Sequence, residues 1–274
     1  MTSQTNIQWT DYTWNIAVGC TKVDEDCKYC YMYRDSMKNT RYDPKVVRKT
    51  KTVFTKPLRI KEPSRIFVSS LTDVFHPEID SFRDEMWEII RQCPQHTFQI
   101  LTKRPERIAA HLPEDWGDGW NNVWLGTSVG SMNGFSRALA LSDDEIPAKV
   151  KFLSIEPLYE YEFLPTFTSV NFRLPHLVIQ ERSVFKFFDW VIIGGESGNE
   201  TGKYRYRPCK VEWIRVIIKE CQEADIPVFV KQLGTHLAKE LSLKDRHGGD
   251  ISEWPEDLRV REFPVIHNSN QNQR

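Results

Sequence analysis

The sequence predicts an α/β fold, a partial or near-complete parallel (β/α) barrel with about six to seven strands. Short apolar runs rich in β-branched residues recur along the chain and alternate with polar or helical stretches. The runs are TWNIAV (13–18), RIFVSS (65–70), TFQILT (97–102), VWLGTSV (123–129), VKFLSI (150–155), WVIIGG (190–195) and PVFVKQL (227–233). Because each run is almost continuously hydrophobic, these runs are typical of strands buried on both faces of a parallel sheet.

Two stretches between the runs have apolar residues at helical spacing. Residues 81–93 and 211–222 each bring apolar side chains to one face, and Ser81 with Asp84 resembles a capping box at the start of the first helix. Cys93, Cys209 and Cys221 lack the spacing of a cluster motif. Cys93 and Cys221 lie on these apolar faces and are interpreted as core residues. The alternation of strands and helices favours a parallel barrel.

Most of the chain is predicted to form one domain. Residues 1–262 contain all the strand-like runs, and a length of 274 residues suits one barrel. The connection at about 157–188 is long and aromatic-rich, and we interpret it as an insertion in which SVNFRL and HLVIQE could pair as strands. The tail HNSNQNQR lacks core-forming residues, and residues 263–274 are predicted to be disordered.

Composition and charge give no sign of a membrane protein. The formal net charge is −1, no apolar run approaches transmembrane length, and the N-terminus lacks the apolar core of a signal peptide. We therefore expect a cytoplasmic protein with no membrane partner. In that compartment thiols stay reduced, so clustered cysteines indicate metal binding or catalysis more often than disulfides.

Three cysteines follow the first predicted strand in the sequence GCTKVDEDCKYCY: Cys20, Cys27 and Cys30. Active residues of parallel barrels lie at the carboxyl ends of the strands, so this loop is placed at the functional end. Three thiolates complete neither a zinc tetrahedron nor a four-cysteine cluster, whereas a [4Fe–4S] cluster held by three cysteines leaves one iron open. A zinc site completed by a histidine such as His76 is the alternative.

The cysteine loop, which ends in Cys-x-aromatic-Cys (Cys27, Tyr29, Cys30), resembles that of the radical S-adenosylmethionine (SAM) superfamily. SSLTDVFHPEID and ILTKRPERI resemble strand ends of its spore photoproduct lyase-like branch. The ordered motifs over roughly residues 7–235 are similar to a phage- and prophage-borne radical-SAM-like family, whose members would act in the cytoplasm of a bacterial host cell. The resemblance implies an enzyme in which the open iron binds SAM. Reduction by a flavodoxin- or ferredoxin-type donor then cleaves SAM to a 5′-deoxyadenosyl radical that abstracts hydrogen from a substrate.

The cysteine spacing departs from the common pattern of that superfamily. Its usual members have three residues between the first two cysteines, whereas this chain has six, TKVDED. Asp24, Glu25 and Asp26 would add negative charge near a cluster and make its reduction harder. The alternative is that these residues form a solvated loop apex.

The resemblance also implies roles for residues at the strand ends. Tyr29 would lie by the adenine, and the hydroxyls and carboxylate after the second strand would meet the methionine amino group. For Asp73 a helix N-cap is the alternative. Paired glycines after the sixth strand would allow close approach to adenine, although a tight turn would also use them. The full set of cofactor-binding candidates is Tyr29, Ser69, Ser70, Thr72, Asp73, Lys103, Ser128, Glu156, Gly194, Gly195 and Glu196. Arg104, Lys231 and Gln232 could meet SAM or substrate.

A basic segment at 45–65 bears on the substrate, since it holds eight lysines and arginines against one glutamate. Such a segment could lie along phosphates, which favours a nucleobase, nucleotide or nucleic acid, although a solvated connection is the alternative. Two other functions remain open. One is a non-catalytic nucleic-acid-binding protein with a structural zinc site. The other is a metal-dependent hydrolase on a TIM barrel, which is weakened because no His-x-His or Asp/His set occurs at the strand ends.

Overall fold

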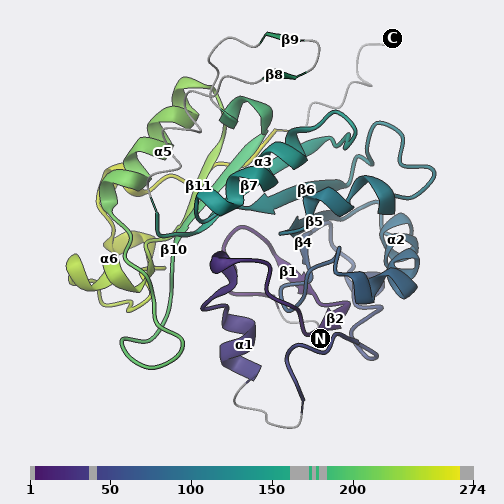
Figure 1. Cartoon of the computed structure of the whole chain (residues 1–274), viewed down its shortest axis with the longest axis horizontal. Coiled ribbons are helices and arrows are strands. Elements are labelled where there is room, and N and C mark those ends of the chain that lie inside the picture. Colours follow the sequence, from purple (N-terminus) through teal and green to yellow (C-terminus); the bar gives the residue numbers. More distant parts are fainter. Residues whose placement is uncertain (1–3, 37–41, 161–172, 175–176, 179–183, 266–274) are drawn as a thin grey trace.

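The fold is a parallel sheet that curls into a partial barrel (Figure 1). The computed structural model describes residues 4–36, 42–160, 173–174, 177–178 and 184–265. Seven strands form the main sheet in the order β1-β4-β5-β6-β7-β10-β11, and every neighbouring pair is parallel. Their bounds are β1 Tyr12–Trp14, β4 Arg65–Val68, β5 Thr97–Thr102, β6 Val123–Ser128, β7 Val150–Leu158, β10 Trp190–Gly195 and β11 Val228–Gln232. The predicted fold class is confirmed.

The first and fifth runs differ most from the observed strands. The first run divides, because β1 ends at Trp14 and Ala17–Val18 form β2, which pairs antiparallel with β3 (Arg48–Lys49). The chain leaves the sheet at Asn15, whose side-chain oxygen accepts hydrogen bonds from the Leu71 backbone and from the Ser70 hydroxyl. The fifth run extends further than predicted, since β7 continues to Leu158.

Side chains that point into the barrel change from apolar to polar along the strands. An apolar cluster near the strand starts packs around Trp9, which is 3% exposed. Its members are Trp9, Phe67, Trp124, Val150, Phe152, Trp190, Ile192 and Phe229. Because strand residues alternate between faces, the inward positions that follow Phe152 on β7 are Ser154 and Glu156. The apolar cluster therefore fills the amino end of the barrel, and polar groups line its carboxyl end.

Helices cover the outer face of the sheet and complete a larger apolar core. They are α2 (Arg83–Arg91), α3 (Phe135–Ser142), α5 (Val211–Glu223) and α6 (Gly234–Glu240). The helix α1 (Tyr31–Ser36) lies apart from this core, and its buried Met32 and Tyr33 pack with Tyr204 beside the cysteine loop. The predicted capping box is wrong, because Pro77–Phe82 form a 3₁₀ helix and α2 begins at Arg83 without a side-chain cap. The core assignment of Cys93 and Cys221 is confirmed, since both are buried, and Cys209 is buried as well.

The long connection after β7 holds the predicted strand pair. Arg173–Leu174 (β8) and Leu177–Val178 (β9) pair antiparallel, as expected for SVNFRL and HLVIQE. The remainder of the predicted insertion lies mostly outside the described residues, as does the predicted disordered tail from residue 266 onward. Among the described helices, none has the length and apolar character needed to cross a bilayer.

Candidate functional site

One cavity at the carboxyl ends of the strands collects the predicted site. Its volume is about 490 Å³, within the usual range of small-molecule sites. All three loop cysteines line it, and so does every cofactor-binding candidate except Gly194. Arg104, Lys231 and Gln232 line it as well. The rule that active residues lie at strand ends therefore placed residues from seven strand ends around one space.

The cysteine loop crosses the mouth of the barrel with its thiols partly buried. Cys20, Cys27 and Cys30 are half-exposed as residues, and burial raises the pKa of the Cys20 thiol to about 11 and that of Cys30 above its ordinary value. Gly19 has a φ of 104°, and a Cβ there would lie 2.2 Å from the Val46 carbonyl oxygen. A glycine is therefore required just before the first cysteine.

The three loop cysteines are not gathered with other described donors around a single metal position. Within the described ranges, no three His, Cys, Asp or Glu side chains converge on one metal position. Each cysteine of an iron–sulfur cube binds a different iron, so the three thiols of a cluster site need not converge in this way. The histidine proposed for zinc is engaged elsewhere, because His76 accepts from the Glu78 backbone through Nδ1 (3.2 Å) and contacts Thr21 Oγ1 through Nε2 (2.9 Å).

The acidic spacer between the first two cysteines is partly buried, and its aspartates form ion pairs. Asp26 is 4% exposed, and both Asp24 and Asp26 form ion pairs with Arg137 of α3. Burial raises the pKa of Asp26, but the Tyr159 hydroxyl and the charges of Arg137 and Lys103 outweigh burial and lower it. Asp26 is therefore an ionised, buried anchor of the loop.

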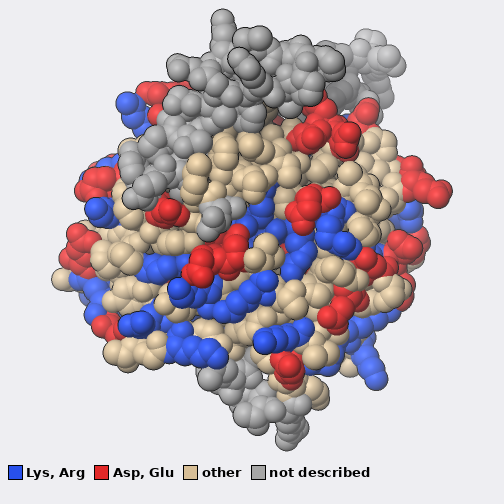
Figure 2. All heavy atoms as spheres, viewed as in Figure 1, with Lys and Arg blue, Asp and Glu red and all other residues tan. Residues whose placement is uncertain are grey.

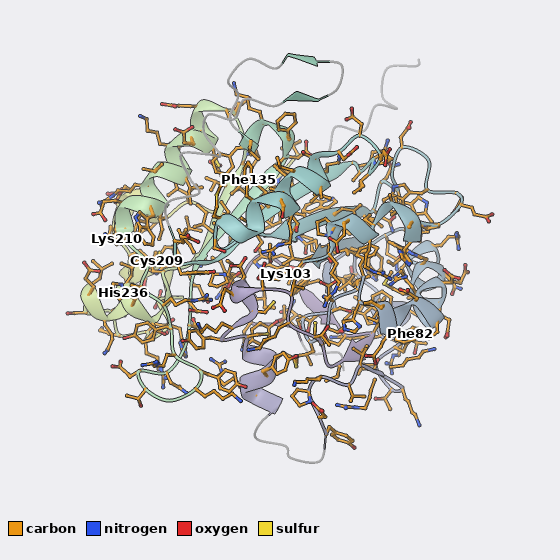
Figure 3. The ribbon with its side chains drawn as sticks, viewed as in Figure 1. Phe82, Lys103, Phe135, Cys209, Lys210 and His236 are labelled. Atoms are coloured by element: carbon orange, nitrogen blue, oxygen red, sulfur yellow. The ribbon has the colours of Figure 1, made fainter. Side chains whose placement is uncertain are left out.

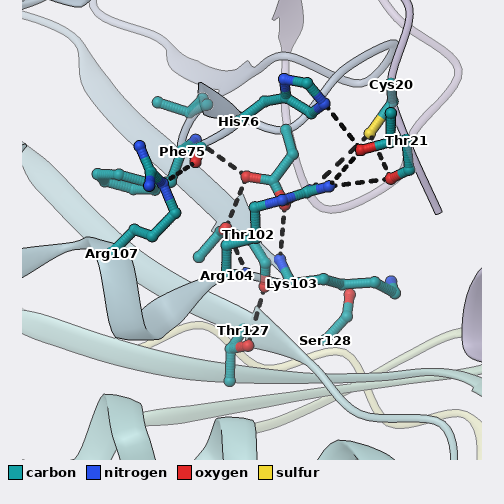
Figure 4. A network of polar contacts seen from close by, with 12 residues as sticks. Cys20, Thr21, Phe75, His76, Thr102, Lys103, Arg104, Arg107, Thr127 and Ser128 are labelled. Carbon is teal, nitrogen blue, oxygen red and sulfur yellow. Dashed lines mark hydrogen bonds and ion pairs between the residues drawn. The ribbon is translucent and has the colours of Figure 1, made fainter. Parts of the chain in front are cut away.

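Asp73 is occupied by donors from its own strand-end neighbours (Figure 4). Its carboxylate accepts four hydrogen bonds, from Phe75 N (2.9 Å), Thr102 Oγ1 (2.6 Å), Lys103 N (2.9 Å) and Arg104 Nη1 (3.0 Å). Two donors therefore meet each oxygen. The contact with Phe75 N closes a local turn, and the helix N-cap alternative is wrong, because the 3₁₀ helix that follows is capped by His76. This arrangement assigns Asp73 a role in holding the end of β5 to the loop after β4.

Arg104 links Asp73 to the cysteine loop (Figure 4). Its guanidinium donates to the Thr21 carbonyl (2.9 Å) and hydroxyl (3.0 Å), and Nη1 lies 4.0 Å from Cys20 Sγ. Burial lowers the pKa of Arg104, but the Asp73 carboxylate and Cys20 outweigh burial and raise it. Arg104 is therefore a fixed positive charge beside the first cysteine.

Two hydroxyls in the cavity wall lack partners. Among the described side chains, Ser69 Oγ and Thr72 Oγ1 are buried without a hydrogen bond. Such orphaned groups are rare unless a ligand satisfies them. Ser69 also has a φ of 66°, a left-handed conformation that is strained for a residue with a side chain. Ser70 differs, because its hydroxyl donates to Asn15.

The opposite wall carries a second ion pair and the two glycines. Lys231 of β11 pairs with Glu156 of β7 across β10, which lies between these two strands in the sheet. A Cβ on Gly194 would lie 3.1 Å from Glu156 Cδ, and one on Gly195 would lie 2.0 Å from the Leu233 carbonyl oxygen. Packing therefore requires a glycine at 195, whereas a Cβ at 194 would only require the Glu156 side chain to shift slightly, and only Gly195 lines the cavity.

The remaining candidates differ in whether their polar groups already have partners within the fold. Glu196 is 8% exposed and pairs with Arg207 at 2.7 Å. Tyr29 lies 5.4 Å from the guanidinium carbon of Arg207, measured to the ring centroid. Among the described residues, the Lys103 ammonium has no ion pair, and Figure 3 shows it near the middle of the molecule. The charge of Lys103 also contributes to the lowered pKa of Asp26.

Sequence reasoning missed three residues that shape the site: Arg137, Tyr159 and Arg207. The first two contact Asp26, and the Arg207 guanidinium carbon lies 3.4 Å from the Tyr159 ring centroid. The surplus of acidic residues in the spacer was the available signal, because a buried carboxylate needs a cationic or hydrogen-bonding partner. Nothing in the local sequence identified which arginines supply it.

Comparisons with known proteins are sparse. No curated protein sequence matches the chain. Among solved structures, it is similar to a spore photoproduct lyase mutant with bound AdoMet and dinucleoside spore photoproduct, with a TM-score of 0.40 and 12% identity. The alignment covers 78% of this chain and 62% of that chain, so the chain spans less than two thirds of that structure.

The family comparison extends over the whole site. DUF5131, described as "Protein of unknown function", matches residues 4–262. This range includes all seven strands of the main sheet and every residue of the cavity wall. The chain therefore belongs to the family DUF5131.

Proposed function

We propose that the protein is a radical SAM enzyme in which Cys20, Cys27 and Cys30 hold a [4Fe–4S] cluster. One observation carries the proposal. Three cysteines and two buried, unpartnered hydroxyls line the same cavity at the carboxyl ends of a parallel barrel. The cysteines supply three ligands and leave one iron open, and the hydroxyls offer polar contacts to a small ligand bound beside them.

The residues of the cavity divide into roles toward SAM. Ser69 and Thr72 would donate or accept hydrogen bonds at its polar groups, because neither hydroxyl is engaged. Lys103 would meet its carboxylate. When bound and reduced, a [4Fe–4S] cluster supplies the electron that cleaves SAM to methionine and a 5′-deoxyadenosyl radical. The barrel wall orients the ligand and excludes water, with the apolar cluster around Trp9 closing the amino end.

A nucleobase, nucleotide or nucleic acid is the proposed substrate class. Figure 2 shows lysines and arginines gathered across the middle of the displayed face. Within the basic segment, however, several cations have partners in the fold, among them Lys49 with Glu85 and Arg65 with Asp11. Four cations of the segment are exposed without an ion pair in the part of the chain that the structure describes: Lys45, Lys51, Arg59 and Lys61. A flavodoxin- or ferredoxin-type protein is proposed as electron donor.

Anaerobic reconstitution with ferrous iron and sulfide tests the proposal. We expect about four irons and four sulfides per chain, and release of 5′-deoxyadenosine when dithionite and SAM are added. Cys93→Ala is the control, since that thiol is buried in the core and should not change the iron content. Stoichiometric zinc without acid-labile sulfide would instead support the structural-zinc alternative, and absence of both metals would refute the proposal.

A further inference from the structure

Arginines from three different strand ends hold the spacer between the first two cysteines. Arg104 follows β5, Arg137 lies in α3 after β6, and Arg207 follows β10. Each one contacts a different part of residues 21–26. We call these three residues the arginine cradle.

Two members of the cradle hold the backbone of the spacer. Arg104 donates to the Thr21 carbonyl at 2.9 Å, and Arg207 donates to the Glu25 carbonyl at 2.9 Å. A carboxylate orients each of these two guanidinium groups, since Arg104 pairs with Asp73 and Arg207 pairs with Glu196. The backbone is thus held near both ends of the spacer.

The third member holds its side chains. Arg137 forms ion pairs with both Asp24 and Asp26, and its Nε donates to the Ser128 carbonyl at 2.8 Å. The side chains of Arg137 and Asp26 are 6% and 0% exposed. A lysine could not reproduce this arrangement, because one ammonium cannot present the planar fork that meets two carboxylates and a carbonyl.

The surrounding chain is shaped around this contact. Gly130 N donates to Asp26 at 2.9 Å, and a Cβ on Gly130 would lie 3.0 Å from the same carboxylate. A Cβ on Gly134 would lie 2.7 Å from Arg137 Nη2. The Tyr159 hydroxyl completes the set by donating to Asp26 at 2.7 Å. The absence of a side chain at Gly130 and Gly134 therefore leaves the space in which Arg137 forms its ion pairs.

We infer that Arg137, with Arg104 and Arg207, is a positioning residue that sets the first two cysteines for cluster binding; this inference rests on the proposed function. A spacer of six residues permits more conformations than a shorter one, and ordering it costs conformational entropy when the cluster binds. The cradle orders the spacer in advance, so the thiols are held near their binding positions before the metal arrives. Removing it should leave the ligands in place but weaken their hold on the cluster.

The test compares Arg137→Gln, Arg137→Lys and wild type after anaerobic reconstitution with ferrous iron and sulfide. Outer contacts of this kind typically change metal affinity by about 10- to 100-fold. We expect iron release to a ferrous chelator to be faster in Arg137→Gln by about that factor, with Arg137→Lys intermediate. The electron paramagnetic resonance spectrum of the reduced cluster should also change, which a general loss of stability would not produce. Arg215→Gln is the matched control, because Arg215 pairs with exposed Asp257 and touches no residue of the loop.

The outcomes separate the inference from the proposed function. Circular dichroism of the metal-free variants establishes that each is folded at the assay temperature. If Arg137→Gln does not fold, Arg207→Gln replaces it and should show the same faster release, since its side chain is partly exposed. Equal release and identical spectra in folded variants and wild type would overturn the inference alone. Wild type that takes up no iron and sulfide would overturn the proposed function and the inference together.

Discussion

Replacing Arg104 with glutamine should destabilise the metal-free protein, because it leaves the Asp73 carboxylate buried without its cation. The two side chains are 10% and 8% exposed, and their charged atoms lie 3.0 Å apart. Removing one partner of a buried pair typically costs about 3–5 kcal/mol. The lower value applies here, because Asp73 keeps its hydrogen bonds to Thr102, Lys103 and Phe75. For a domain near this size, about 3 kcal/mol lowers the melting temperature by about 6–12 °C.

Thermal unfolding of four metal-free proteins measures the coupling: wild type, Arg104→Gln, Asp73→Asn and the double variant. We expect the double variant to be more stable than the sum of the single changes predicts, by about 1–3 kcal/mol, because the two residues interact directly. Arg107→Gln is the control on the same loop. Its pair with Asp80 is more exposed, at 27% and 41%, so its loss should cost about 1 kcal/mol or less. Strictly additive single changes, or equal losses for Arg104 and Arg107, would refute the reasoning.

Four further predictions concern the cavity and its surface. Alanine at any one of the loop cysteines should abolish iron and sulfide uptake in anaerobic reconstitution, whereas Cys93→Ala should not; retained uptake would contradict the ligand assignment. In the metal-free protein the raised pKa of Cys20, about 11, leaves about one thiol in a thousand ionised at pH 8. Its alkylation rate, followed by mass spectrometry, should therefore rise about tenfold per pH unit until that pKa, and a plateau near pH 8 would show that burial does not control this thiol. Ser69→Ala should weaken SAM binding to the reconstituted protein about tenfold in equilibrium dialysis, whereas Ser70→Ala, whose hydroxyl has another partner, should not. If nucleic acid is the substrate, replacing three exposed lysines with alanine should flatten the slope of log affinity against log salt by roughly one unit per true phosphate contact. A salt titration measures this slope. Lys49→Ala, which breaks an ion pair within the fold, is the control. The exposed lysines are Lys45, Lys51 and Lys61.

The seven strands of the sheet could be predicted because each is a continuous apolar run with a clear end. What the sequence did not show is where long-range contacts overrule the local pattern. The first run reads as one strand over 13–18, yet Asn15 accepts hydrogen bonds from a loop more than fifty residues away, and β1 ends before it. Likewise Pro77 begins a 3₁₀ helix that His76 caps, and this contact displaces the start of α2 to Arg83.

The position of the site could be predicted more reliably than the tasks of its residues. The carboxyl ends of parallel strands meet at one end of the barrel, so listing the strand ends was sufficient to assemble the cavity wall. Partners could not be assigned in the same way, because they depend on side chains from other strand ends. Asp73 was expected to meet a ligand, but residues 102–104 supply three of its four donors. Gly194 was expected at the adenine, but it makes room for Glu156.

The expected effect of the acidic spacer on cluster reduction depends on the partners of its carboxylates. From the sequence, Asp24, Glu25 and Asp26 would surround a cluster with negative charge and oppose its reduction. In the fold, Arg137 pairs with both aspartates and offsets one of their two negative charges, and Lys28 pairs with Glu25 at the surface. Net charge near a cluster is one of the determinants of its potential, so the spacer should oppose reduction less with Arg137 present than without it. The same residue would then have two effects, since the ion pairs that order the longer spacer also reduce the electrostatic cost of its carboxylates.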